Sequence, residues 1–268
     1  MTGPADILGQ ICARRRQRLG VAAGEFALPP AGTCAEGRTA VGADNAFVAA
    51  LAARRGGAVI AEVKLGSPKL GSLVGSFDPE EQARTYAGAG AAALSVVVEP
   101  DFFWGDYDVL RRCREVSGLP AVAKDFVVSY EQLEAARRAG ASAVLLVASL
   151  YDAETLGRFA AAARSLGLVP LVETHDLADL RKLADRDWEL VGVNNRDLRT
   201  FEVDLDHSIS LVPALPPGAL RVAESGIRCR GDVVTLQRAG FDAFLIGESL
   251  VKSQDPAAKL AELLGAAA

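Results

Sequence analysis

Short apolar segments alternate with segments of helical periodicity along most of the chain. From residue 58 onward, eight runs of strand character are each followed by a stretch rich in Ala, Leu and Arg with helical spacing. The runs begin near Ala58, Ala92, Ala121, Ala143, Leu168, Leu190, Leu220 and Asp242. Eight successive strand–helix units predict a parallel sheet, and their number favours closure into a (β/α)8 barrel, or TIM barrel, over an open sheet.

Glycine follows several of the predicted helices directly before the next strand. Gly90, Gly140, Gly167 and Gly240 precede the second, fourth, fifth and eighth strands. Glycine at this position is typical of a helix C-cap. We therefore expect these four residues to be structural rather than catalytic.

The first 57 residues have a different pattern. Segments 6–19 and 45–55 have helical spacing, whereas the Pro- and Gly-rich segment 26–37 between them does not. We expect residues 1–57 to form an N-terminal helical extension that packs on the barrel. The catalytic barrel domain would then span residues 58–268.

Composition excludes some classes of partner. A chain of 268 residues that is 50% hydrophobic can bury one large core. A net charge of −5 opposes a nucleic-acid partner bound through a broad basic surface, and we expect the basic run 14–18 to be a solvated helix face. No apolar run suits a signal peptide or a membrane span, so the expected location is cytoplasmic and no membrane partner is expected.

The four cysteines suggest neither a disulfide framework nor a zinc site. They are Cys12, Cys34, Cys113 and Cys229, and none belongs to a CxxC pair or lies near a histidine cluster. We expect reduced, structural thiols and no metal.

Five apolar runs end abruptly in polar residues that can transfer protons or hold an anion. These residues are Glu62 and Lys64, Lys124, Glu173, Asn194, and Glu224 with Ser225. In a parallel barrel the carboxyl ends of the strands line the active site, so one fold would bring all of them together. Two lysines and three glutamates in one partly desolvated mouth would shift each other's proton affinities, which suits general acid–base catalysis.

Each of these residues also has a simpler interpretation. Any single strand-end carboxylate could be an ion pair that closes the end of the barrel. His175 is expected to be a loop or helix-cap residue rather than the catalytic base, because Glu173 already holds the strand-end position.

The last two units carry a pattern that suits phosphate. Gly226 follows the seventh strand and Gly247 the eighth, where small residues let backbone N–H groups approach an anion. Segment 102–104 (Phe-Phe-Trp) and Phe126 could form an aromatic wall for a planar ring, with core packing as the alternative for each.

Taken together, these motifs resemble the indole-3-glycerol-phosphate synthase family. The resemblance rests on Glu62–Lys64 with Ser67-Pro68, Lys124–Phe126, Leu171–Glu173 with His175-Asp176, Gly192–Leu198 and Glu224–Ile227, in order, and extends from the N-terminal helix to Leu250. It implies a lyase of tryptophan biosynthesis that converts 1-(2-carboxyphenylamino)-1-deoxyribulose 5-phosphate to indole-3-glycerol phosphate with loss of carbon dioxide and water. It also implies a small phosphosugar as substrate and no metal or organic cofactor.

The resemblance assigns roles to individual residues. Lys124 would be the general acid that protonates the substrate carbonyl, and Lys64 would pair with substrate anions and serve the dehydration. Glu62, Glu173, Asn194, Glu224 and Ser225 complete the implied catalytic set. The implied substrate-binding residues are Ser67, Phe103, Phe126, Leu145, Arg196, Gly226, Gly247 and Glu248. We expect a monomer or weak homodimer, and association with other enzymes of the pathway stays open.

Three departures from the family pattern concern residues that we expect at the barrel mouth. The first loop has Leu65-Gly66 and Lys69 where the family has a basic residue and a serine, Val98 replaces a threonine, and Ala123 precedes Lys124. A paralogue that acts on a modified anthranilate-derived phosphosugar is therefore one alternative.

Two further alternatives are less consistent with the sequence. Phosphoribosylanthranilate isomerase would need a Cys/Asp pair, but no strand here ends in such a cysteine. A catalytically silent barrel subunit would not need Lys64, Lys124 and Glu173.

Overall fold

The computed structural model describes residues 7–29, 42, 44–184, 186–197, 200 and 202–265. Cys34 and most of the Pro- and Gly-rich segment lie outside these residues. Two helices precede the first strand, α1 (Ile7–Leu19) and α2 (Ala46–Ala52).

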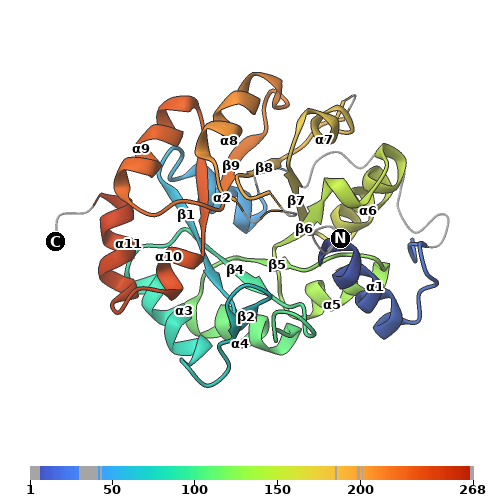
Figure 1. Cartoon of the computed structure of the whole chain (residues 1–268), viewed down its shortest axis with the longest axis horizontal. Helices are drawn as coiled ribbons and strands as arrows, with labels where there is room; N and C mark the ends of the chain where they lie inside the picture. The colour runs from blue at the N-terminus through green and yellow to red at the C-terminus, as the bar shows by residue number, and fades with distance from the viewer. Residues whose placement is uncertain are drawn as a thin grey trace.

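Eight parallel strands close into a barrel, as the strand–helix pattern predicts (Figure 1). Each strand begins within one residue of the position expected from the sequence. In chain order the strands are β1 (Ala58–Val63), β4 (Ala93–Val97), β5 (Ala121–Lys124), β6 (Ala143–Val147), β7 (Val169–Thr174), β8 (Leu190–Asn194), β9 (Leu220–Glu224) and β10 (Ala243–Ile246). β1 pairs with both β4 and β10, which closes the ring. A short hairpin, β2 (Gly66–Ser67) and β3 (Gly71–Ser72), follows β1.

Helices surround the strands, and polar caps fix where most of them begin (Figure 1). Each strand is followed by at least one of the helices α3 (Pro79–Gly88), α4 (Tyr107–Ser117), α5 (Tyr130–Arg138), α6 (Ala153–Ser165), α7 (Leu177–Arg181), α8 (Leu205–Leu211), α9 (Arg230–Ala239), α10 (Glu248–Val251) and α11 (Pro256–Leu264). Asp78, Ser129 and Asp152 are examples of N-caps that accept backbone N–H groups of the first turn. The four glycines expected at helix ends all have positive φ, which confirms their structural role.

Alternation along each strand separates two apolar layers. On β1, Ala58 and Ile60 pack inside the barrel, whereas Val59, Ala61 and Val63 pack outward against the helices. Continuing the inward series by two residues gives Glu62 and then Lys64. The polar residue at the end of each catalytic strand thus lies on the same face as the core beneath it.

Helix α2 closes the opposite end of the barrel. Its Phe47 and Leu51 are completely buried among interior residues such as Ala58 and Ala93 at the beginnings of strands. The cap residue Asn45 donates its side-chain amide to the carbonyl of Ser142, directly before β6. Among the described residues, the barrel interior is thus filled at the amino ends of the strands.

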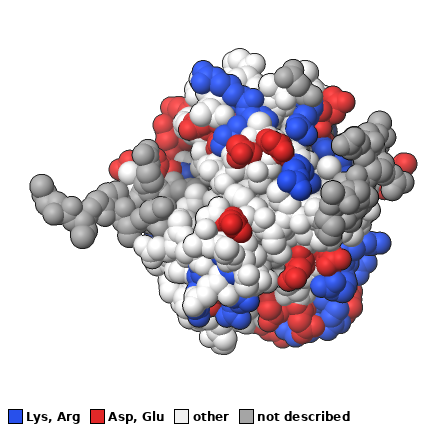
Figure 2. All heavy atoms as spheres, turned by 90° about the vertical axis from the view of Figure 1, so that its right-hand side faces the viewer, with Lys and Arg blue, Asp and Glu red and all other residues white. Residues whose placement is uncertain are grey.

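The surface of the described residues carries both signs of charge. On the face shown in Figure 2, Lys and Arg lie interspersed with Asp and Glu. Within the described ranges, no helix combines the length and the apolar character needed to cross a membrane.

Candidate active site

A lysine between two glutamates forms the centre of the site. Lys124 ends β5, and its Nζ lies 3.0 Å from Oε2 of Glu173 on β7 and 3.3 Å from Oε2 of Glu224 on β9. Burial alone would lower the pKa of Lys124. The negative charges of Glu173 and Glu224 outweigh this effect and raise the pKa, so the side chain is an ammonium at neutral pH.

The two glutamates differ in how well their charge is supported. Burial would raise the pKa of Glu173, but Lys124, His175 and an Asn194 Nδ2 hydrogen bond of 3.0 Å to Glu173 Oε1 lower it. Glu224 has the same lysine, but its Oε1 has no hydrogen-bond partner among the described residues. Burial therefore raises the pKa of Glu224, and Lys124 does not reverse the shift. The negative charge of Glu173 adds to this rise, so the pKa of Glu224 is shifted upward and that of Glu173 downward.

A second lysine–glutamate pair lies beside the first. Lys64 Nζ is 2.6 Å from Oε1 of Glu62, as their shared strand face predicts. Two glycines leave room for the carboxylates: a Cβ at Gly192 would lie 2.0 Å from Glu224 Oε1, and a Cβ at Gly247 would lie 2.2 Å from Glu62 Oε1. We name the five residues Glu62, Lys64, Lys124, Glu173 and Glu224 the mouth cluster.

The mouth cluster opens into a cavity of about 550 Å³ at the carboxyl ends of the strands. Such a volume suits a small organic substrate. All the residues of the implied catalytic and substrate-binding sets line it: Glu62, Lys64, Ser67, Phe103, Lys124, Phe126, Leu145, Glu173, Asn194, Arg196, Glu224, Ser225, Gly226, Gly247 and Glu248. The strand-end pattern thus identifies residues that share one cavity, whereas their roles in it stay predictions.

The aromatic wall is smaller than the sequence suggests. The rings of Phe103 and Phe126 lie 6.1 Å apart at 34° and both face the cavity. Phe102 and Trp104 are not among the residues that line it. The Trp104 ring instead packs on the first loop, where a Cβ at Gly66 would lie 2.3 Å from it.

The end of the cavity near β9 and β10 is rich in basic groups and unusual backbone. Ser225 and Gly226 have φ of 67° and 81°, and left-handed backbone at a non-glycine residue is typical of functional sites. Arg196 binds Glu248 at 2.7 Å, and Lys252 binds the same carboxylate at 2.6 Å. Arg228 also lines this end.

Helix α1 contributes to the site, which the sequence does not predict. Its Ile7, Leu8 and Ile11 line the cavity. The expectation that the basic run of α1 is solvated is wrong for Arg15, which is 3% exposed and lies 2.5 Å from Asp125. An arginine run on a helix is usually exposed, but here a carboxylate from another element pairs with it.

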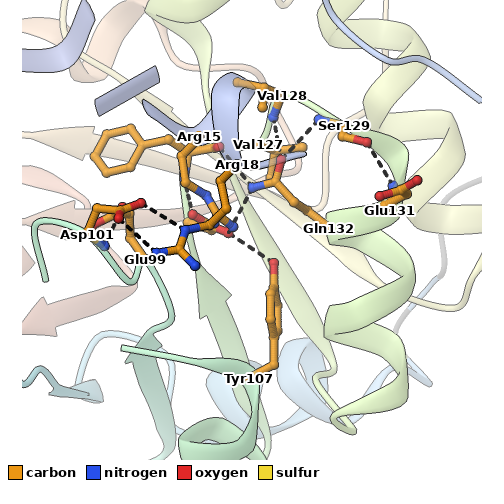
Figure 3. Close-up of polar contacts among 12 residues, drawn as sticks. Arg15, Arg18, Glu99, Asp101, Tyr107, Val127, Val128, Ser129, Glu131 and Gln132 are labelled. Carbon is orange, nitrogen blue, oxygen red and sulfur yellow. Dashed lines mark hydrogen bonds and ion pairs between the residues drawn. The ribbon is translucent and has the colours of Figure 1, made fainter. Parts of the chain in front are cut away.

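Asp125 is the centre of a hydrogen-bonded group that we name the rim network, made of Arg15, Tyr107, Asp125 and Gln132. The Oδ2 atom accepts from Tyr107 at 3.0 Å and from Gln132 at 2.8 Å, in addition to Arg15. Beside it, Arg18 binds Asp101 at 2.9 Å (Figure 3). Helix α1 is thereby attached to the loops that follow β4 and β5.

Only one of the three departures from the family pattern lies at the mouth. Lys69 lines the cavity, half exposed, with Nζ 3.9 Å from Glu248. The expectation is wrong for Val98 and Ala123, which are buried in the layer between strands and helices. Ala123 precedes an inward residue and therefore points outward.

His175 is a loop residue, as expected, but it does not cap the next helix. Asp176 is the cap of α7 and accepts the N–H of Asp179. The His175 ring lies instead behind Glu173, outside the cavity lining. Among the described residues, no three His, Cys, Asp or Glu side chains gather as metal ligands would.

A parallel barrel with a desolvated lysine–glutamate cluster at the carboxyl ends of its strands defines an acid–base enzyme of the (β/α)8 class. The chain matches the family model described as indole-3-glycerol phosphate synthase over residues 8–263. The chain belongs to this family.

Relatives in curated collections agree with this match. A protein named indole-3-glycerol phosphate synthase from Albidiferax ferrireducens is 41% identical over 98% of this chain and 99% of its own length. The protein of the same name from Neisseria meningitidis serogroup B is 45% identical over 77% of this chain and 79% of its own length.

Solved structures resemble the fold alone. A 3-hexulose-6-phosphate synthase from Salmonella typhimurium has a TM-score of 0.61 at 14% identity, covering 78% of this chain and 97% of its own. A tryptophan synthase α-subunit from Pyrococcus furiosus has a TM-score of 0.57 at 17% identity, covering 79% and 99%.

Proposed function

We propose that this chain converts 1-(2-carboxyphenylamino)-1-deoxyribulose 5-phosphate to indole-3-glycerol phosphate, carbon dioxide and water. Family membership across residues 8–263 supports the reaction. The observation that carries it is the partly buried Lys124 ammonium, held between Glu173 and Glu224 at the wall of the cavity.

Ring closure needs a proton at the place where negative charge develops. As the aromatic carbon attacks the ketone carbon, a carbon–carbon bond forms and the carbonyl oxygen becomes an alkoxide. Lys124 would donate its proton to this oxygen; an alkoxide is basic enough to accept it even from an ammonium of raised pKa. The carboxylate then leaves as carbon dioxide.

The remaining steps are elimination and proton removal. The hydroxyl formed in the first step leaves as water, and a base removes a proton from the neighbouring carbon to complete the indole. We assign Lys64, paired with Glu62, to the substrate anions and to this dehydration, and Glu173 to proton transfer with Lys124. Phe103 and Phe126 would hold the aromatic ring against the reacting carbon.

The phosphate of the substrate would lie at the end of the cavity formed by Ser225, Gly226 and Gly247. Small residues there expose backbone N–H groups, and Arg196 and Arg228 supply positive charge nearby. A ligand-bound structure tests this placement, and phosphate found elsewhere in the cavity would refute it.

The reaction itself is tested by incubating purified protein with the carboxyphenylamino-deoxyribulose phosphate and recording indole fluorescence. We expect fluorescence to rise until the substrate is consumed. Lys259→Ala is the matched control for Lys124→Ala, because Lys259 lies on α11 and pairs with Glu262 away from the cavity. Absence of product with folded wild-type protein would remove the proposal.

A modified substrate is the second candidate, and the first loop favours it. Lys69 lines the cavity where the family pattern has serine, while Gly66 is packed against Trp104. Turnover of a ring-substituted analogue faster than the unsubstituted compound would support this candidate.

We also propose a cytoplasmic enzyme that is a monomer or weak homodimer. The thiols of Cys113, which is buried, and Cys229, which is exposed, are both free, which is consistent with a reducing compartment. Sedimentation of purified protein across a concentration series tests the oligomeric state.

A further inference from the structure

One titratable side chain at the site is not explained by contact with the cavity. His175 follows β7, and its Nε2 lies 3.3 Å from Oε1 of Glu173. On the other side of the ring, Nδ1 lies 3.6 Å from Oδ2 of Asp179 on α7. Both ring nitrogens are buried, and neither has a hydrogen-bond partner among the described residues. The imidazole ring therefore lies between two carboxylates and is held there by charge.

The position of the His175 ring between two carboxylates determines its protonation state. A neutral imidazole has one N–H and one lone pair, so one of the two carboxylates would face a lone pair. Only the imidazolium presents a donor on both sides. Burial alone would lower the pKa of His175, but Asp179 and Glu173 outweigh it and raise the pKa.

The surrounding charges support the same state. The cations nearest the ring, Lys124 on β5 and Lys182 on α7, are each paired with a carboxylate, and Glu224 on β9 lies farther from the ring than Glu173 and Asp179 do. His207 on α8 contacts the backbone carbonyl of His175 rather than its ring.

Asp179, on the side of the ring away from Glu173, is held in place by several contacts. Asp179 is 4% exposed, and its Oδ2 also accepts the backbone N–H of His175 at 3.1 Å. Lys182 binds its Oδ1 at 3.0 Å and the carbonyl of Ala148 at 2.8 Å. A ring anchored in this way can act on Glu173 without moving.

We propose that His175 is a positioning residue: as an imidazolium fixed by Asp179, it keeps Glu173 ionised and turned toward Lys124. Glu173 then has Lys124 on one oxygen and Asn194 with His175 on the other. Glu224 lacks equivalent support on its Oε1, so the proton shared by the two glutamates resides on Glu224. His175 thereby assigns the two carboxylates different proton states before substrate binds.

The charge on the ring is tested first without any assay of activity. The sequence contains two histidines, so nitrogen NMR spectra are expected to show the ring nitrogens of two imidazoles. The substitution His207→Gln removes the signals of one ring, and the ring signals that remain are then those of His175. We expect the His175 ring to stay doubly protonated well above the pH at which an unperturbed histidine titrates. A neutral ring at pH 7 would overturn the proposal.

The action on Glu173 is tested by kinetics, and this part rests on the proposed function. His175→Gln keeps a polar side chain but removes the charge, so Glu173 gains a proton at higher pH. We expect the acid limb of the kcat profile to move to higher pH and kcat to fall about 10- to 100-fold, as for a misplaced catalytic group, while KM changes little. Unchanged kcat and an unchanged acid limb would overturn it.

Asp179→Asn distinguishes positioning from a general loss of structure. In the wild-type background it should lower kcat at neutral pH, because His175 then loses its proton more easily. In the His175→Gln background it should have no further effect on kcat. Additive losses would overturn the proposal. If wild-type protein shows no turnover, the proposed function fails, and the NMR titration still decides the charge of His175.

Discussion

Lys124 and Asp125 are neighbours in the chain, but they belong to two buried charge groups with different properties. In the rim network, Asp125 accepts from three side chains and from the N–H of Phe126. In the mouth cluster, Lys124 is shared by Glu173 and Glu224, and one Glu224 oxygen lacks a partner.

The comparison shows how similar residues can serve stability or chemistry. Asp125, which accepts from three side chains, holds α1 on the barrel, and removing Arg15 would leave a buried charge without compensation. Charges that compete for one partner shift each other's pKa, which prepares a proton for transfer. The rim network gathers several donors on one carboxylate, whereas the mouth cluster has two carboxylates that compete for one lysine.

The largest effect is expected for Lys124→Ala. Removing the proton donor should lower kcat by about 10²–10⁴-fold, while the backbone groups that hold phosphate still bind substrate. Steady-state kinetics and equilibrium binding on the same preparation check this. Near-normal turnover would remove the role given to Lys124 and with it the contrast between the two groups.

Arg15→Ala should act on stability instead. Asp125 would lose its buried counter-charge, and we expect the free energy of unfolding to fall by about 3–5 kcal/mol. Urea unfolding measures it. Arg14→Ala is the matched control, because Arg14 is one residue away on α1 but half exposed, and its pair with Asp101 should contribute about 0–1 kcal/mol. Equal losses in the two variants would contradict the buried pair.

Glu224→Gln should alter how stability depends on pH. Because burial raises the pKa of Glu224, the folded protein binds a proton that the unfolded chain releases above its ordinary pKa. This contribution to stability is present at acid pH and is lost as pH rises through the raised value, by about 1.4 kcal/mol per unit. Between pH 5 and 9, the free energy of unfolding should therefore fall less in the variant than in the wild type. Parallel curves would mean that Glu224 is ionised throughout.

The smallest effect is expected for Lys69→Ser. This exposed cation should strengthen substrate binding modestly, so KM should rise a few-fold at low salt while kcat changes little. The difference should shrink as salt rises, since charges are screened over about 10 Å at 0.1 M ionic strength. Unchanged affinity at low salt would mean that Lys69 only faces solvent and that the first-loop departure has no effect on specificity.

The fold and the composition of the cavity follow from local patterns in the sequence. Parallel strands of similar length end at one edge, so Glu173 and Glu224 meet although 51 positions separate them. The same alternation that places Glu62 above Ile60 puts Ala123 and Val98 on the outward face of the barrel.

Other features depend on contacts between distant segments. The burial of Arg15 requires Asp125 from another element, and an arginine-rich helix alone indicates exposure. The position of His175 requires Asp179 one turn into the next helix, at an i, i+4 spacing that is visible in the sequence. That spacing is the one signal that could have suggested a paired histidine. The boundary of the N-terminal extension at residue 58 stays a prediction.

Ring closure at the mouth cluster is the central step of the proposed reaction. Carbon dioxide and indole-3-glycerol phosphate should therefore be counted in one reaction with wild-type protein and the carboxyphenylamino-deoxyribulose phosphate. We predict equal amounts of the two products, both lost together in Lys124→Ala. Carbon dioxide without indole, or undiminished products from Lys124→Ala, would contradict ring closure driven by the Lys124 ammonium.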